Sequence, residues 1–268
     1  MRSLGCRPCC LTAFFALAAA DVAAADLIFA KDFDLEAGPG PTQACAFSPD
    51  ASGFFTLTSA ASTYVVRLPP AYDTLNPAPQ RLLVALHGCG DTAYNFATWA
   101  AVPTALRSTQ DYIAISVGGH DGGCFNTSSD TAIVLAAIEH VRSCFYVHRR
   151  RIVLGGYSTG GMLAYKMAMA PGLVYAGVLI ENSGLSQAVG GVGNVDAALD
   201  AAMWPLNVGH SASVDDASFA IAGVRADRDK LIAHSFPLQY RELAGSGDGN
   251  SDDWTLYLIP QMATWVSP

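Results

Sequence analysis

The stretch Arg151-Ile-Val-Leu-Gly-Gly-Tyr-Ser-Thr-Gly-Gly161 decides the fold of this chain. An apolar, β-type run at 152–154 is followed by a helical pattern at 162–170, which Pro171-Gly172 ends. Between them Ser158 stands with a glycine two residues on either side, which predicts a sharp strand-to-helix turn with the serine at its tip. Such a turn exposes the hydroxyl and directs the backbone N–H of Thr159 at any oxyanion formed there. The pattern alone is weak, but its context favours a nucleophile over a structural glycine-rich turn.

The first 25 residues have the features of a secretory signal peptide. Two arginines precede an apolar run at 11–20, and small residues end at Ala25. The run is too short to span a bilayer, and Cys9-Cys10 lacks the context of a lipid-attachment site, so we expect no membrane anchor. We therefore predict a secreted protein, extracellular or periplasmic, in which residues 26–268 form a single catalytic domain.

The charge of the chain argues against one class of partner. The formal net charge is −8, and the only basic cluster is Arg149-Arg150-Arg151 before an apolar run. An acidic chain without a basic stripe predicts no nucleic-acid binding, and the cluster is interpreted as a solvated rim. Nothing in the sequence implies an obligate protein partner, and oligomeric state is left open.

Apolar segments and helical patterns alternate along the chain, which predicts a mostly parallel sheet with helices on both faces. We expect strands at 63–68, 81–86, 112–117, 152–154, 174–180, 206–208 and 238–243, and helices at 131–141, 162–170, 227–233 and 254–265. The first strand is expected to be partly exposed, and Asp130 to cap the helix at 131–141. The glycine-rich segment 188–194 lacks the lysine of a phosphate loop and is predicted to be a flexible loop.

A second motif, His87-Gly-Cys89-Gly90, follows directly after a buried strand. Two backbone N–H groups aimed at a carbonyl oxygen stabilise the charge that acyl transfer places there. A small-residue loop after an early strand supplies one such group in serine hydrolases, and Thr159 would supply the other. The alternative is a plain strand-end turn with a buried histidine.

Three motifs in order resemble one known family. These are His87-Gly-Cys-Gly90, Cys124-Phe-Asn126 and Gly156-Tyr-Ser-Thr-Gly-Gly161 with Ala164-Tyr165 after it. The chain resembles the secreted polyhydroxybutyrate depolymerase-like esterases, a group with feruloyl and acetylxylan esterases, from residue 45 to its end. The resemblance implies an α/β-hydrolase fold, Ser158 as nucleophile, and an oxyanion hole made by Cys89 and Thr159.

The resemblance also implies a catalytic acid and two disulfides. The run 206–216 resembles the family's strand, histidine and aspartate, in a register that favours Asp216 over Asp215; the alternative is a solvated turn. Four cysteines remain after the signal peptide, and their even number in an exported chain suggests two disulfides, with three pairings open. The family pattern implies Cys124–Cys144 and Cys45–Cys89.

The general base is missing from its expected place. Gly247 stands where the family carries histidine after the last strand, and a serine nucleophile needs a base within hydrogen-bond reach. His210 is the best substitute, although a structural role is the simpler interpretation. A histidine introduced at 247 should raise turnover, provided that Gly247 does not need a positive φ. His87, His120 and Tyr157 are predicted to line the substrate pocket.

Two functions follow from these observations. The first is a serine esterase acting on a small or oligomeric carboxylic ester without metal or organic cofactor. The second is a hydrolase-fold protein that has lost its base and serves as a binding module. Ser158 and both oxyanion elements favour the first, and Gly247 favours the second.

Overall fold

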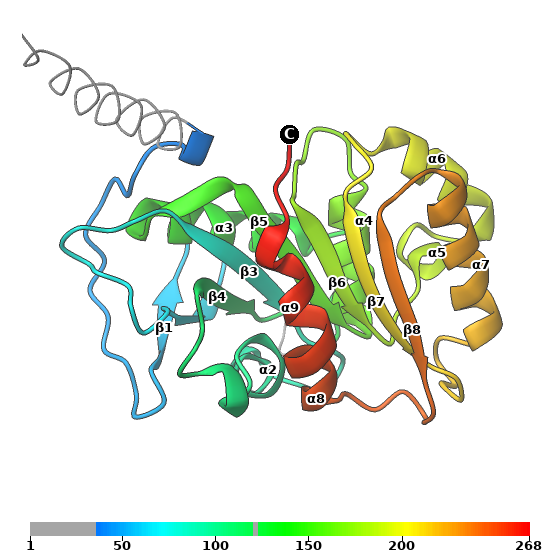
Figure 1. The fold of residues 1–268 in the computed structure, drawn as a ribbon, viewed down its shortest axis with the longest axis horizontal. Helices are drawn as coiled ribbons and strands as arrows, with labels where there is room; N and C mark the ends of the chain where they lie inside the picture. Colours follow the sequence, from blue (N-terminus) through cyan, green and yellow to red (C-terminus); the bar gives the residue numbers. More distant parts are fainter. Residues whose placement is uncertain (1–35, 120–122) are drawn as a thin grey trace, which may run out of the picture. The chain divides into compact units, whose positions relative to one another are not determined.

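The computed structural model describes residues 36–119 and 123–268, and residues 37–268 form one compact unit. The signal peptide predicted at 1–25 lies outside the described residues. An eight-stranded sheet runs through the unit in the order β1-β2-β4-β3-β5-β6-β7-β8 (Figure 1). The strands are β1 (Phe54–Thr58), β2 (Thr63–Arg67), β3 (Gln80–Leu86), β4 (Tyr112–Val117), β5 (Val147–Tyr157), β6 (Gly177–Glu181), β7 (Asn207–Ser213) and β8 (Leu238–Leu243).

The sheet is mostly parallel, as predicted. Strands β3 to β8 pair in parallel, whereas β1 and β2 pair antiparallel to their neighbours. The prediction that segment 63–68 is partly exposed is wrong for most of its length, since residues 64–67 are buried. These residues are buried because β1, which was not predicted from the sequence, pairs with the free edge of β2.

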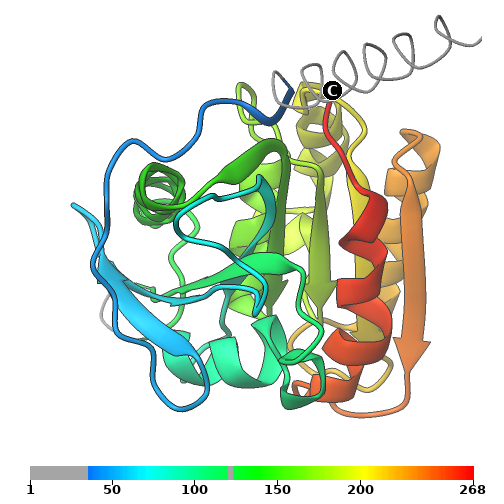
Figure 2. The same ribbon diagram turned by 60° about the vertical axis from the view of Figure 1, so that its left-hand side comes forward.

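Helices cover both faces of the sheet (Figures 1 and 2). On one face lie α3 (Thr131–Cys144), α4 (Thr159–Ala168), α5 (Leu185–Ala188), α6 (Val195–Ala201) and α7 (Ile221–Ala233), with the turn η4 (Val192–Asn194) between α5 and α6. On the other lie α2 (Ala93–Phe96), η1 (Ala97–Ala101) and the C-terminal run of α8 (Ser251–Asp253), η5 (Trp254–Leu258), α9 (Ile259–Gln261) and η6 (Met262–Thr264). The short turn η2 (Thr104–Leu106) follows η1. Each face has its own apolar core, so the central strands are buried on both sides. No helix among the described residues is long and apolar enough to cross a membrane.

Three local predictions differ from the structure. Asp130 occupies the N-cap position of α3, as predicted, but its side chain makes no capping hydrogen bond; the carboxylate instead accepts from the Asn126 N–H at 2.9 Å and the Ser129 hydroxyl at 2.8 Å. The C-terminal segment 254–265 is not one regular helix but a series of π, α and 3-10 turns. The segment 188–194 is also not loop throughout, since it ends in the 3-10 turn η4.

The disulfide pairing implied by the resemblance is wrong. The structure joins Cys45 to Cys144 and Cys89 to Cys124, with Cα separations of 5.4 and 4.1 Å. Cys89 and Cys124 follow the carboxyl ends of the neighbouring strands β3 and β4, whereas Cys144 ends α3. A helix of that length separates its ends by about 20 Å, which no disulfide spans. Cys144 therefore pairs with the segment before β1.

Candidate active site

Ser158 lies on the turn between β5 and α4, in a backbone conformation that non-glycine residues rarely adopt. Its φ is 54° and its ψ is −121°. The turn is compact because a Cβ on Gly156 would overlap the backbone of Gly160, and a Cβ on Gly160 would overlap the carbonyl group of Leu86. The Ser158 N–H donates to the carbonyl oxygen of Glu181 at 3.2 Å, which ties the turn to β6. Strain of this kind persists where the surrounding packing imposes it, and it gathers at functional sites.

The loop after β3 touches the tip of this turn. A Cβ on Gly88 would lie 2.6 Å from the ring of Tyr157 and 3.2 Å from the Cβ of Ser158. The sulfur of Cys89 lies 3.5 Å from the side-chain oxygen of Thr159. The structure therefore brings Cys89 and Thr159, the two residues expected to supply oxyanion donors, beside the Ser158 side chain.

Asp216 and Gly247 meet across the next two loops. Asp216 follows β7, and its Oδ1 accepts from the backbone N–H groups of Ser218 at 2.7 Å and Phe219 at 3.0 Å. Its Oδ2 faces Gly247 so closely that a Cβ there would overlap it. Asp216, the predicted acid, is half-buried, whereas Asp215 is exposed. The position where the family carries histidine thus lies directly against that carboxylate.

The backbone of Gly247 restricts what this position can hold. Its φ is +95°, a region that L side chains rarely adopt. Histidine at 247 was expected to raise turnover only if Gly247 did not need a positive φ, and the structure shows that it has one. A side chain at 247 would meet both a strained backbone and the Asp216 carboxylate.

Comparisons with known proteins identify the fold. No protein-family model matches the chain. Over 127 residues it is 27% identical to feruloyl esterase C of Emericella nidulans, an alignment that covers 46% of each chain, so the match spans about half of that relative. A solved ferulic acid esterase superposes with a TM-score of 0.61 at 14% identity, over 78% of this chain and 94% of its own. The S-formylglutathione hydrolase FrmB of Staphylococcus aureus gives 0.59 at 14% identity, over 84% and 98%.

The chain has the α/β-hydrolase fold. Its sequence and its fold are both similar to those of feruloyl esterases. Within this fold Ser158 lies on the turn between β5 and α4, and the loop after β3 lies against that turn. The loops after β7 and β8 carry Asp216 and Gly247.

His210, the predicted substitute base, lies within β7 and is buried at 2% exposure. Its Nδ1 forms a hydrogen bond with the hydroxyl of Tyr165 in α4 at 2.9 Å. Burial lowers the pKa of His210 to about 3, so the imidazole accepts a proton poorly near neutral pH. These are the contacts of a structural histidine, and its role as base stays an untested prediction.

The other predicted pocket residues have different surroundings. His87 is buried, its Nδ1 lies 2.7 Å from the Gly88 carbonyl oxygen, and its Nε2 accepts from the Gly119 N–H at 3.4 Å. It therefore supports the loop that carries Cys89. Tyr157 is half-buried, and its hydroxyl donates to the carbonyl oxygen of Gly247 at 2.8 Å. This hydrogen bond joins the Ser158 turn to the loop after β8. His120 lies outside the described residues.

Two residues at the end of β6 belong to the site although sequence reasoning missed them. Asn182 has a φ of 44°, accepts from the Ser213 N–H at 2.8 Å and donates to the Asp248 carbonyl oxygen at 3.3 Å. It thus joins the loops that carry Asp216 and Gly247. Glu181 is buried, and its carboxylate accepts from the Asn250 N–H and the Trp254 indole, each at 2.7 Å. The polar run 181–183, which follows the apolar run 178–180, is the signal that could have identified them.

Glu181 and Asn182 line a half-open cavity of about 290 Å³ together with Ser213 and the loop 243–250. Burial raises the pKa of Glu181 to about 7, against the opposing effect of its hydrogen bonds to Trp254 and Asn250. The carboxyl group can therefore be neutral or charged near neutral pH. The cavity shares Gly247 with the Asp216 site, and its lining includes both polar and apolar groups.

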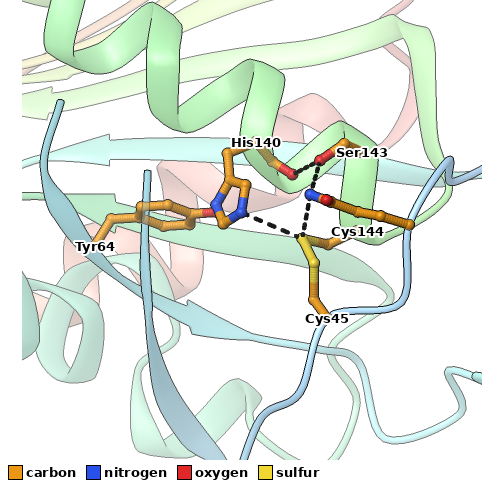
Figure 3. The surroundings of a disulfide bond; sticks show 6 residues. Cys45, Tyr64, His140, Ser143 and Cys144 are labelled. Carbon is orange, nitrogen blue, oxygen red and sulfur yellow. Dashed lines mark hydrogen bonds between the residues drawn. A yellow bond between two sulfur atoms is a disulfide. The ribbon is translucent and has the colours of Figure 1, made fainter. Parts of the chain in front are cut away.

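One group of side chains has the composition of a metal site. Cys45, His140 and Cys144 bring their ligand atoms within 4.8 Å of one another, in the part of the chain that the structure describes. Both cysteines are joined in a disulfide, however, and an oxidised sulfur is not the thiolate that metals bind (Figure 3). The prediction that the protein needs no metal or cofactor is not tested by this arrangement.

Proposed function

We propose that this protein is a serine hydrolase of carboxylic esters, with Ser158 as its nucleophile. The observation that carries the proposal is the strained Ser158 turn with the Cys89 loop packed against it. A hydroxyl held at such a turn, beside two small-residue backbone segments, has the arrangement that acyl transfer requires. The similarity to a curated feruloyl esterase supports the same reaction.

The proposed reaction has two steps. The Ser158 oxygen attacks the ester carbonyl carbon, its proton passes to a base, and the carbonyl oxygen becomes an oxyanion near the Thr159 and Cys89 N–H groups. Collapse expels the alcohol and leaves an acyl group on Ser158, which water then removes. Asp216 would orient the base and stabilise its charge.

The base determines how fast this protein works. Among the described residues no histidine forms a hydrogen bond with the Ser158 hydroxyl, and Gly247 occupies the place beside Asp216. An oxyanion hole and substrate binding alone retain roughly a thousandfold acceleration over water. We therefore expect slow turnover with a normal preference for esters.

The substrate we propose is a small or oligomeric ester of an aromatic or short-chain acid. Feruloyl esterase C is the curated relative that the chain resembles, and polyhydroxybutyrate depolymerase-like activity stays a further candidate. We also propose that the protein is exported, because two disulfides persist in an oxidising compartment rather than in the cytosol.

The second candidate is a binding protein that has the hydrolase fold but no turnover. The observation in its favour is Gly247, whose backbone lies where a base would have to face Asp216. Such a protein would bind esters at Ser158 without cleaving them.

One experiment separates the two candidates. We expect a fluorophosphonate to label the wild-type protein and short-chain aryl esters to be hydrolysed, and Ser158→Ala to lose both signals while keeping its thermal midpoint. His210→Gln serves as the matched control and should keep the labelling rate, whereas loss of labelling in a folded His210→Gln protein would make His210 the base. Absence of wild-type labelling together with saturable ester binding would establish the binding protein.

A further inference from the structure

The disulfide Cys45–Cys144 forms a second chemical site, on elements other than the Ser158 turn. Cys144 ends α3, and Cys45 lies in the segment before β1. Together they line an open cavity of about 270 Å³ whose walls include the rings of Phe47, Tyr72 and Phe145. A small molecule with an apolar part can therefore approach the sulfur atoms directly.

The two sulfur atoms of this bond have unequal surroundings (Figure 3). The Nε2 of His140 and the Nε2 of Gln43 each lie 3.8 Å from the sulfur of Cys144. In the part of the chain that the structure describes, no such donor reaches the sulfur of Cys45. Cys45 is half-exposed, whereas Cys144 is 7% exposed. Cys45 is thus the more accessible residue of the pair, and the Cys144 sulfur is the one with two nitrogen donors near it.

Tyr64 sets the orientation of the His140 ring. Its hydroxyl lies 2.8 Å from the Nδ1 of His140, and its own side chain is buried beneath α3. Burial raises the pKa of the Tyr64 phenol, so the group stays protonated and can donate to Nδ1. With Nδ1 accepting, the proton of the neutral imidazole lies on Nε2, the nitrogen that faces Cys144. A protonated imidazole presents the same N–H to the sulfur.

We propose that Cys45–Cys144 is a thiol-exchange site, at which a small thiol attacks Cys45 and Cys144 leaves as a thiolate stabilised by His140 and Gln43. In the first step the external thiolate forms a bond to the sulfur of Cys45, and the Cys45–Cys144 bond breaks with its electron pair on Cys144. A second external thiolate then releases Cys45 and carries the first away as a low-molecular-weight disulfide. The protein disulfide is reduced by two electrons, and two external thiols are oxidised.

The physical reason for this direction is the stability of the leaving group. A thiolate beside an imidazole N–H is favoured, and a more stable leaving thiolate departs faster. The disulfide Cys89–Cys124 provides an internal comparison, because both of its cysteines are exposed and, among the residues that the structure describes, the polar group recorded beside the Cys89 sulfur is the Thr159 hydroxyl rather than a nitrogen donor. If exposure alone set the rate of exchange, Cys89–Cys124 would react faster than Cys45–Cys144. If nitrogen donors beside the leaving sulfur set the rate, exchange at Cys45–Cys144 is favoured.

The test measures the rate of thiol exchange at both disulfides in one sample. The intact protein is treated with 2-mercaptoethanol at fixed pH, quenched with acid, alkylated and mapped by peptide mass. We expect a mixed disulfide on Cys45 with an alkylated Cys144, formed at least about five times faster in the wild type than in His140→Gln. The rate at Cys89–Cys124 should be the same in both proteins. A mixed disulfide found mainly on Cys144, or an equal rate in folded His140→Gln, would overturn the proposal.

A second variant tests the same proposal in case His140→Gln does not fold. Gln43 is exposed, so Gln43→Leu removes one donor without disturbing a core. We expect it to slow exchange at Cys45–Cys144 by about twofold, with the rate at Cys89–Cys124 unchanged. An unchanged rate at Cys45–Cys144 in both variants would show a disulfide with a structural role only.

Discussion

Replacing Gly160 by alanine tests whether close packing creates the Ser158 turn. A Cβ at 160 would overlap the carbonyl groups of Leu86 and His87, the residues that lead into the Cys89 loop. The neighbours are backbone atoms and cannot rotate away, so either α4 or the loop after β3 must shift. Overpacking of this kind typically costs about 1–3 kcal/mol. Gly223 in α7 is the matched control, because nothing lies within 4 Å of its Cβ position.

The two variants should change stability in opposite directions. Alanine is favoured over glycine in an open helix by about 0.5–1 kcal/mol, so Gly223→Ala should be the more stable protein by about 1.5–4 kcal/mol. In a domain of this size each kcal/mol shifts the thermal midpoint by about 2–4 °C. Thermal unfolding followed by circular dichroism measures the difference, and fluorophosphonate labelling should slow only in Gly160→Ala. Equal or higher stability of Gly160→Ala, with unchanged labelling, would refute the packing argument.

Two further predictions concern the end of β6 and the loop after β8. Gly247→His should lower the free energy of unfolding by at least about 1–2 kcal/mol and leave ester hydrolysis slow, because φ at 247 is +95° and Asp216 blocks the side chain; a tenfold rise in turnover would contradict this. Gly245→Ala is its control, since φ there is +137° but no atom lies within 4 Å, so only the backbone contribution remains. Burial raises the pKa of Glu181 from 4.5 to about 7, so the folded protein holds a proton that the unfolded chain loses. Stability should therefore fall as pH rises from about 4.5 to about 7, by up to about 3 kcal/mol, and then level off. Denaturant unfolding across this range should show a smaller fall in Glu181→Gln, and an identical pH profile in both proteins would show that Glu181 is not responsible.

Much of the site follows from local sequence. The strand before Ser158, the glycines around it and the helix after it all lie within about twenty residues, so short-range steric rules predict the turn. The buried strands β3 and β4 are likewise recognisable as continuous apolar runs. Helix α3 shows its apolar positions through its periodicity, although the Asp130 side chain makes no capping hydrogen bond.

Other features depend on contacts between distant segments. β1 is only five residues long, and its pairing with β2, which buries residues 64–67, is a contact between two strands that the pattern of either strand does not reveal. The pairing of the cysteines depends on which ends of strands and helices meet, and α3 separates Cys124 from Cys144. Asn182 joins the loops after β7 and β8 through two hydrogen bonds that no spacing in the sequence indicates.

The fold class and the serine turn follow from local sequence patterns, because periodicity and steric limits on a short turn act between neighbouring residues. Only the tertiary structure decided that Gly247 has a left-handed backbone against Asp216, that His210 bonds to Tyr165, and that Cys45 pairs with Cys144. These contacts join residues far apart in the chain, and their geometry depends on how the whole sheet and its helices pack.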